Sequence, residues 1–282
     1  MSTNPKGFLA TGVAAGLKSS GLADLALIQN VGPLKSAAAV FTKNRVIAAP
    51  VVWSKQVIKD GQIEAVLLNS GGANACTGPE GFADTHKSAE ILSESLEISS
   101  SNTFICSTGL IGVRLPMEKI ESGIGLAVSN LKSDHWDSAA TAIMTTDSKP
   151  KIVRSNNEGI SFIGIAKGAG MLAPSLATML CVLATDAVVE PDELKAALEY
   201  ATEQTFDRID SDGCTSTNDT VLVMASGSSG VKISLESLKT QLVELCASLA
   251  HQLISDAEGH TKIIAVRVMN AVNESDAVSV GR

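Results

Sequence analysis

Residues 167–187 of this 282-residue chain read KGAGMLAPSLATMLCVLATDA. A lysine and two glycines come first, a proline follows, and an apolar segment rich in strand-forming residues begins near Thr178. The stretch predicts a glycine-rich turn that leads into a buried strand. A hydroxyl at the start of that strand has three interpretations.

The first interpretation is structural, because threonine is common in strands, where its branched Cβ packs well on a pleated surface. The second is nucleotide binding, since Gly168, Gly170 and Ala173 match a loose dinucleotide fingerprint. However, no long helix is evident after them to meet a pyrophosphate. The third is a self-processing nucleophile. Cleavage between Ala177 and Thr178 would give Thr178 a free α-amine, which can act as general base for its own hydroxyl.

The composition indicates a globular protein whose core is built from aliphatic residues. Hydrophobic residues make up 45% of the chain and aromatic residues only 3%, so Ala, Val, Leu and Ile must fill the interior. At this length we expect one large domain or two closely packed ones.

The charge and the cysteines argue against several classes of function. The net charge is −8 and no run of lysines and arginines occurs, which disfavours nucleic-acid binding. No apolar stretch approaches the ~20 residues of a membrane-spanning helix, and the N-terminal residues do not resemble a signal peptide. We therefore expect a cytoplasmic protein that does not bind membranes.

The five cysteines lack C-x-x-C spacing, so we predict no metal site and no disulfide framework.

Hydrophobic patterning predicts interleaved strands and helices. Predicted strands lie at 22–30, 36–44, 50–58, 63–72, 103–109, 160–166, 219–227 and 262–272. Predicted helices lie at 80–96, 116–131, 191–206 and 234–254, and a polar link is expected at 146–159. This mixture favours stacked layers of α/β structure over a barrel.

Six motifs follow one another along nearly the whole chain. They are AAVFTKN (38–44), LLNSGGANACTG (67–78), STGLIG (107–112), AIMTTDSKPK (142–151), KGAGMLAPSLATML (167–180) and DSDGCTSTNDT (210–220). In order and spacing they resemble the glutamate N-acetyltransferases of arginine biosynthesis, also called ornithine acetyltransferases. The resemblance favours the nucleophile interpretation of Thr178.

The resemblance implies a layered α-β-β-α sandwich, of the type shared by aminopeptidases and ornithine acetyltransferases. It also implies self-cleavage between Ala177 and Thr178, into an α-chain region (1–177) and a β-chain region (178–282). Thr178 would then take an acetyl group from N-acetylornithine and pass it to glutamate. No bound cofactor is implied, although acetyl-CoA is a donor for some members, and the family pattern is an assembly of two α and two β chains.

The resemblance also assigns site residues. The family's oxyanion hole, a Thr-Gly pair, matches Thr108 and Gly109, which would otherwise be interpreted as an ordinary turn at the end of a strand. The family's other substrate contacts match Thr145 (with Thr146 as the neighbouring candidate), Lys167 and Glu258. Lys167 could neutralise a substrate carboxylate and Glu258 could bind an ammonium group, whereas alone each would be read as a solvated surface charge.

Three aspartates in the last motif, Asp210, Asp212 and Asp219, have a spacing that suggests a calcium loop. The motif lacks the bidentate glutamate and the regular ligand register of an EF-hand. We therefore predict a loop that supports the active site.

The chain departs from the family pattern in three places. Ala257 stands where the family usually has glycine, and GGAN at 71–74 differs by one residue from the commoner form. The family also continues beyond Arg282 with a segment that supplies substrate contacts, so we expect this chain to fold but to transfer acetyl groups weakly. The alternatives are a related N-terminal-nucleophile hydrolase of the aminopeptidase type and an inactive fragment of the transferase.

Overall fold

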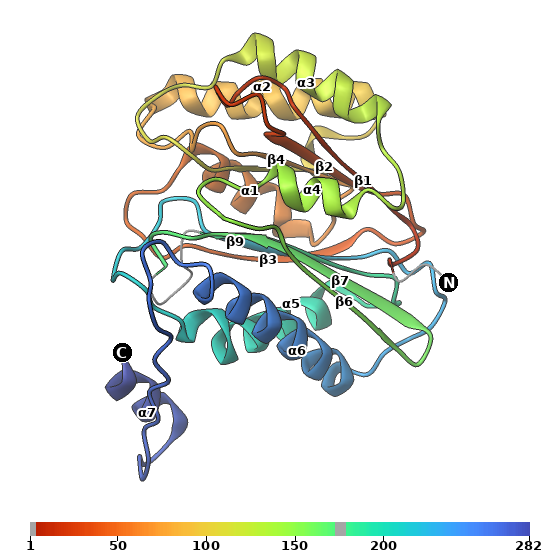
Figure 1. Ribbon diagram of the computed structural model, residues 1–282. Helices are drawn as coiled ribbons and strands as arrows, with labels where there is room; N and C mark the ends of the chain where they lie inside the picture. Colours follow the sequence, from red (N-terminus) through yellow and green to blue (C-terminus); the bar gives the residue numbers. More distant parts are fainter. Residues whose placement is uncertain (1–3, 173–178) are drawn as a thin grey trace.

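The computed structural model describes residues 4–172 and 179–282. Two β-sheets lie face to face, and helices cover the outer face of each sheet (Figure 1). The first sheet has the order β1-β2-β4-β5, with strands Phe8–Val13, Leu25–Asn30, Ala65–Asn69 and Thr103–Ser107. The second has the order β3-β9-β8-β7-β6, with strands Ser36–Phe41, Thr220–Ala225, Leu180–Thr185, Ile160–Lys167 and Lys151–Asn157.

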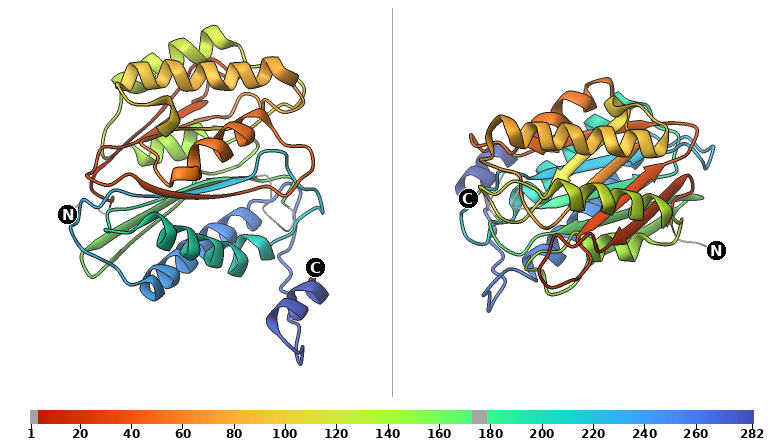
Figure 2. Two further views of the ribbon diagram at one scale, coloured as in Figure 1. Left: turned by 180° about the vertical axis from the view of Figure 1, so that it is seen from behind. Right: turned by 90° about the horizontal axis from the view of Figure 1, so that it is seen from above.

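Helices complete the layers. Helices α2 (Gly78–Leu96) and α3 (Met117–Ser129) pack on the outer face of the first sheet, and α5 (Pro191–Gln204) and α6 (Leu235–Ile254) pack on that of the second (Figure 2). Helix α4 (Trp136–Ala142) contacts strands of both sheets, α1 (Ala49–Val57) packs against β5 and α2, and α7 (Glu274–Gly281) lies apart from the layers. Short 3₁₀ turns occupy Ile58–Asp60, Ser100–Asn102 and Phe206–Arg208. The predicted α-β-β-α sandwich is the architecture observed.

Two strand pairs run parallel, β4 with β5 and β8 with β9, and the other neighbours are antiparallel. Strands of parallel pairs are buried on both faces and therefore have continuous apolar sequences. AVLLN in β4 and TVLVMA in β9 follow this rule, since every residue in them is buried. Because β4 and β5 are parallel, their carboxyl ends lie at the same edge of the sheet. The motifs that follow them, at 67–78 and 107–112, meet there.

The two sheets share one core. Small and branched side chains from both sheets cluster with Trp136 of α4, which is completely buried. The ring of Phe8 from β1 meets Trp136 edge-on, with the ring centroids 6.2 Å apart. The scarcity of aromatic residues is consistent with this arrangement, since alanines on β1, β2, β3 and α4 allow the layers to approach closely.

The predicted helix at 234–254 shows how sequence specifies an element. Ser234 caps α6 by accepting a hydrogen bond from the Ser237 amide at 3.2 Å. The leucines at 238, 242, 245, 249 and 253 are spaced by three or four residues and are all buried against the second sheet.

The prediction of a strand at 50–58 is wrong, because this segment forms α1. Its valines suggested a strand, but Pro50 occupies the first helical turn, where the missing N–H is not needed. Val51, Ser54 and Val57 are buried at a three-residue spacing, which is helical. The Ser54 hydroxyl contacts β5, donating to the carbonyl of Ile105 at 2.7 Å and accepting from its amide at 3.0 Å.

Two other expectations are corrected. The polar link at 146–159 contains β6, an edge strand whose many polar residues, partly buried except for buried Lys151 and exposed Asn156, concealed it. The predicted strand at 262–272 has no regular structure, and Ile264 and Val266 are 82% and 69% exposed. Alternating apolar residues specify a strand only when a neighbouring strand accepts their hydrogen bonds, and the described part of the chain offers none to this segment.

The dinucleotide-binding interpretation of the glycines at 168 and 170 is also wrong. It requires a long helix directly after the glycine turn, but the described chain resumes at Met179 and runs into β8. The two chain regions predicted from the resemblance share the second sheet: β3, β6 and β7 precede residue 178, and β8 and β9 follow it. Among the described helices, none is both long and apolar enough to cross a bilayer.

Gly12 of β1 provides a test of how closely α4 packs. A Cβ at Gly12 would lie 2.0 Å from the carbonyl oxygen of Ser138 in α4. We expect Gly12→Ala to lower the free energy of unfolding by about 1–3 kcal/mol, because the helix must move. The control is Gly125→Ala on the exposed face of α3, where a Cβ meets nothing within 4 Å; it should stabilise by about 0.4–1 kcal/mol. Urea unfolding measures both changes. Equal free energies of unfolding for the two variants would contradict the close packing of α4 against Gly12.

Candidate functional site

A cavity of about 800 Å³ lies where β5 and β7 end. All six predicted site residues that the structure describes line it: Thr108, Gly109, Thr145, Thr146, Lys167 and Glu258. Ala177 and Thr178, the predicted cleavage site and nucleophile, lie outside the described residues. A cavity of this size suits a small-molecule ligand.

Hydrogen bonds at the ends of the strands explain why these motifs converge. The buried amide of Asn218, just before β9, donates to the carbonyls of Ala73 at 2.7 Å and Ser107 at 2.8 Å. The Thr108 amide donates to the carbonyl of Asn69 at 2.9 Å. The segments that follow β4 and β5 in the first sheet are thereby attached to the second sheet at the cavity.

Thr108 and Lys167 face each other across the sheets. Lys167 Nζ donates to Thr108 Oγ1 at 3.2 Å, and both side chains are buried. Because the Thr108 oxygen accepts this bond, its own proton is available to donate to an oxygen in the cavity. A hydroxyl backed by an ammonium group can stabilise a developing negative charge on a reacting carbonyl oxygen.

Gly109 has a backbone conformation that disfavours other residues. Its φ is +127°, and a Cβ would lie 2.8 Å from the backbone nitrogen of Gly72. The chain after β5 can therefore turn against the motif at 67–78 only because residue 109 has no side chain. This explains the Thr-Gly pair in physical terms.

The charge on Lys167 is finely balanced. Burial lowers its pKa to about 8, while the carboxylates of Asp147, Asp219 and Glu258 act in the opposite direction. The Lys151 ammonium lowers it further. At neutral pH Lys167 is mostly a cation, and it becomes neutral within one or two pH units above that.

Asp147 organises the backbone around the cavity. Its carboxylate accepts hydrogen bonds from the amides of Thr145 at 2.9 Å and Gly168 at 2.7 Å. Burial alone would raise the pKa of Asp147, but the ammonium groups of Lys167 and Lys151 and the Gly168 amide bring it below its ordinary value. Asp147 is therefore a fixed anion that holds two site segments together.

Glu258 reaches the cavity from the loop after α6. Its amide donates to the carbonyl of Ala169 at 2.7 Å, and a Cβ on Gly170 would lie 3.2 Å from its carboxylate. The small residue at 170 therefore leaves space for the carboxylate beside the turn that follows Lys167. Glu258 is exposed, so it can meet a ligand.

A family model described as the ArgJ family matches residues 9–282. The "Arginine biosynthesis bifunctional protein ArgJ" of Thermobifida fusca is 56% identical over 280 residues, which cover 99% of this chain and 73% of that relative. The chain belongs to the ArgJ family. The family indicated by the sequence motifs, and with it the prediction of an acyltransferase of arginine biosynthesis, is confirmed.

Solved structures agree with this membership in the ArgJ family. The ornithine acetyltransferase of Mycobacterium tuberculosis, solved in complex with ornithine, is 49% identical and has a TM-score of 0.55 over 62% of this chain and 95% of that chain. An L-aminopeptidase D-Ala-esterase/amidase of Ochrobactrum anthropi, described as an Ntn-hydrolase variant, has a TM-score of 0.50 over 92% of this chain and 87% of that chain. At 11% identity this second likeness shows the fold alone.

The sequence did not identify one wall of this ArgJ-family cavity, which is formed by residues 17–20. Buried Asp24 shapes this loop by accepting hydrogen bonds from the amides of Ala15, Leu17 and Lys18 at 2.6–2.9 Å. Lys18 Nζ donates to the carbonyl of Met144, directly before Thr145, at 2.7 Å. Lys18 and Asp24 belong to none of the six motifs. Only the uncommon position of Asp24 between two apolar segments could have indicated the loop.

Other lining residues come from known motifs in unassigned roles. Ser70 and Gly71 follow β4, and Asp212 belongs to the motif at 210–220. Asp212 accepts a hydrogen bond from the amide of Met171 at 2.6 Å, and Met171 has a φ of +55°. The predicted supporting loop therefore holds the turn after Lys167 in an uncommon conformation.

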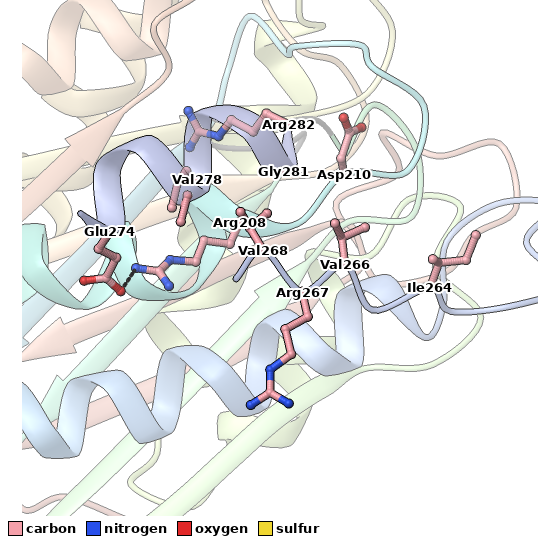
Figure 3. Close-up of a pocket in the computed structure, with 11 residues that line it drawn as sticks. Arg208, Asp210, Ile264, Val266, Arg267, Val268, Glu274, Val278, Gly281 and Arg282 are labelled. Atoms are coloured by element: carbon pink, nitrogen blue, oxygen red, sulfur yellow. Dashed lines mark hydrogen bonds and ion pairs between the residues drawn. The ribbon is translucent and has the colours of Figure 1, made fainter. Parts of the chain in front are cut away.

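A second cavity, of about 470 Å³, lies beside α7 (Figure 3). Arg208, Arg267 and Arg282 are among its lining residues, and Arg208 pairs with Glu274 at 2.8 Å. None of the predicted site residues lines this cavity. It is separate from the cavity assigned to the family's chemistry.

Asp219 is a buried acid beside the glycine-rich turn. Its carboxylate accepts a hydrogen bond from the amide of Met179 at 3.1 Å, and the hydroxyl groups of Ser216 and Thr42 lie next to it. Burial raises the pKa of Asp219 well above its ordinary value, although the Met179 amide and the Lys167 ammonium oppose this.

The raised pKa of Asp219 predicts a pH-dependent stability. A carboxyl with a raised pKa stabilises the folded state only while it is protonated, so its contribution falls as pH rises. We expect Asp219→Asn, which keeps an acceptor for Met179, to raise Tm by a few degrees at pH 7.5 and much less near pH 4. Exposed Asp210→Asn is the control and should change Tm little at either pH. Calorimetry at both pH values checks this prediction. A Tm for Asp219→Asn below that of the wild-type protein at pH 7.5 would contradict it.

Proposed function

We propose that this chain transfers an acetyl group from N-acetylornithine to glutamate through an acetyl ester on Thr178. The observation that carries the proposal is a single cavity that combines cations, anions and a candidate oxyanion donor. Lys18 and Lys167 supply positive charge, and Asp212 and Glu258 supply negative charge. The ArgJ membership and the relative solved with ornithine support this choice of substrates.

The chemistry begins with self-cleavage. The Thr178 hydroxyl attacks the Ala177 carbonyl, the C–N bond breaks in favour of an ester, and water hydrolyses the ester. Thr178 then carries a free α-amine that can accept the proton of its own hydroxyl. Removing this proton makes the hydroxyl a nucleophile at neutral pH.

Acetyl transfer then takes two matched steps. Thr178 Oγ attacks the acetyl carbon of N-acetylornithine, the C–N bond breaks, and the proton passes through the α-amine to the departing ornithine nitrogen. The amine of glutamate attacks the resulting ester, the C–O bond breaks, and a proton returns to Thr178 Oγ. In both steps the carbonyl oxygen gains negative charge, and we assign its stabilisation to Thr108 and Gly109, which line the cavity.

One cavity can serve both substrates because they share an α-amino-acid head. Lys167 is suited to bind a carboxylate and Glu258 an ammonium group. No bound cofactor takes part in these steps, and we propose acetyl-CoA only as a second donor to be tested. We also propose that the processed chains assemble as two α and two β chains, which light scattering would measure.

The requirement for glutamate separates the transferase from its alternatives. We expect ornithine to be released from N-acetylornithine only when glutamate is present, with N-acetylglutamate formed in equal amount. A hydrolase of the aminopeptidase type would release ornithine with water alone. A folded chain that releases none with either N-acetylornithine or acetyl-CoA as donor would be inactive, and the proposal would be wrong.

Self-cleavage has its own test. Intact-mass measurement should show the protein cut between Ala177 and Thr178, and Thr178→Ala should leave one uncut chain, because the attacking hydroxyl is gone. Thr178→Ser keeps a hydroxyl and should still be cut. Cleavage at the same bond in Thr178→Ala would show that Thr178 is not the nucleophile.

The role of Thr108 predicts a large loss of rate. Thr108→Val preserves the shape but removes the donor, so acetyl transfer should slow by a factor on the order of 10²–10³. Thr240→Val, on the exposed face of α6, is the matched control and should retain the wild-type rate. A well-folded Thr108→Val variant with a near-normal kcat would mean that the turn after β5 is merely structural.

A further inference from the structure

A completely buried lysine lies behind the cavity without lining it. Lys151, the first residue of β6, has no exposed side-chain surface. Its Nζ lies 2.6 Å from Asp147 Oδ1 and 2.6 Å from Asp256 Oδ2. A buried ammonium group held by one buried carboxylate, that of Asp147, and one partly buried carboxylate, that of Asp256, is costly to assemble, because the buried charges leave water. Its position calls for a functional explanation.

The first carboxylate connects Lys151 to two site segments. Asp147 accepts hydrogen bonds from the amides of Thr145 and Gly168, in addition to the bond from Lys151. Thr145 lines the cavity, and Gly168 directly follows Lys167. The position of Asp147 therefore determines where both segments lie.

The second carboxylate connects Lys151 to the third site segment. Asp256 accepts hydrogen bonds from the Ser148 amide at 3.0 Å and from the Ser148 hydroxyl. Two residues later, the Glu258 amide donates to the carbonyl of Ala169. The loop that carries Glu258 is thus held both to Lys151 and to the turn after Lys167.

We propose that Lys151 is a positioning residue whose ammonium group holds together the three segments that present Thr145, Lys167 and Glu258 to the substrate. This rests on the proposed function insofar as it takes these three residues as substrate contacts. The benefit is preorganisation, since a misplacement of about 1 Å in a binding group can cost about 10²-fold in rate. A hydrophobic residue could fill the same volume but could not order two carboxylates.

The arrangement also affects the charge of Lys167. The groups that act on Lys167 are Asp147, Glu258 and, when it is ionised, Asp219, which favour its protonated form, and Lys151, which opposes it. Removing the charge of Lys151 should therefore raise the pKa of Lys167 above about 8. Removing the charge of Asp147 should lower it. A residue that only filled space would produce neither shift.

The first experiment measures this charge coupling without any need for catalysis. The chain is labelled with ¹³Cε-lysine, the Lys167 signal is assigned by its loss in Lys167→Arg, and its chemical shift is titrated with pH. We expect a higher pKa in Lys151→Met, a lower one in Asp147→Asn, and no change in Lys195→Met, an exposed control on α5. Shifts in the same direction in the two network variants, or no shift in either, would overturn the proposal.

The second experiment measures positioning through substrate binding and turnover. Lys151→Met should lower kcat/KM for N-acetylornithine about 10–100-fold, mainly through KM, and weaken binding of ornithine in calorimetry. Lys151→Arg, which keeps a buried cation, should recover part of the loss. Asp256→Ala should weaken ornithine binding, because it loosens the segment of Glu258. It should lower the pKa of Lys167 less than Asp147→Asn does, because Glu258 favours the protonated form of Lys167 less strongly than Asp147 does.

The outcomes separate this proposal from the proposed function. If wild-type protein transfers no acetyl group but the opposite pKa shifts appear, the proposed function fails and the charge network stands. If wild-type protein is active and Lys151→Met binds ornithine normally, the positioning role is wrong. Should Lys151→Met fail to fold, Asp256→Ala and Asp147→Asn decide the question, and wild-type ornithine binding in the folded Asp256→Ala variant would overturn the proposal.

Discussion

The side-chain amide of Asn218 joins the two sheets at the end where the cavity lies. It donates to carbonyls at the end of β5 and in the segment after β4, both in the first sheet, while Asn218 itself leads into β9 of the second. Two buried carbonyls depend on this one group, and each would cost about 1–3 kcal/mol if left unpaired. The hydrogen bond between Lys167 and Thr108 spans the same junction. A site assembled from both sheets depends on their being held together here.

Buried charge is the second constraint on this end of the molecule. Lys151, Lys167 and Asp147 lie within one region that is almost inaccessible to water. Both ammonium groups favour the ionised form of Asp147, and Asp147 favours the charged form of Lys167, which Lys151 opposes. Such groups contribute little net stability compared with well-packed apolar residues. They do provide fixed dipoles and charges that need not reorganise when a reaction generates an oxyanion. The region is therefore better understood through its chemistry than through its stability.

Patterns in the sequence predicted those features that depend on local chemistry. The leucine spacing of α6 and the proline at the start of α5 are sufficient to specify helices, because one face of each meets a core. The motifs at 107–112 and 142–151 indicated Thr108 and Thr145 through the family resemblance, and both line the cavity. The sequence did not indicate α4 or β6, whose short or polar sequences make sense only beside their partners.

The sequence by itself determined the family, the layered class of fold and the residue types needed for acyl transfer, since these follow from motifs and periodicity along the chain. Only the tertiary structure decided that Lys18 lines the cavity in a loop that Asp24 shapes, and that Lys151 links Asp147 to Asp256. Lys151 and Asp256 are 105 residues apart, and their contact exists because α6 returns the chain to the start of β6. The burial that gives Lys167 a pKa of about 8 has the same origin, because desolvation depends on everything packed around a side chain and not on its neighbours in sequence.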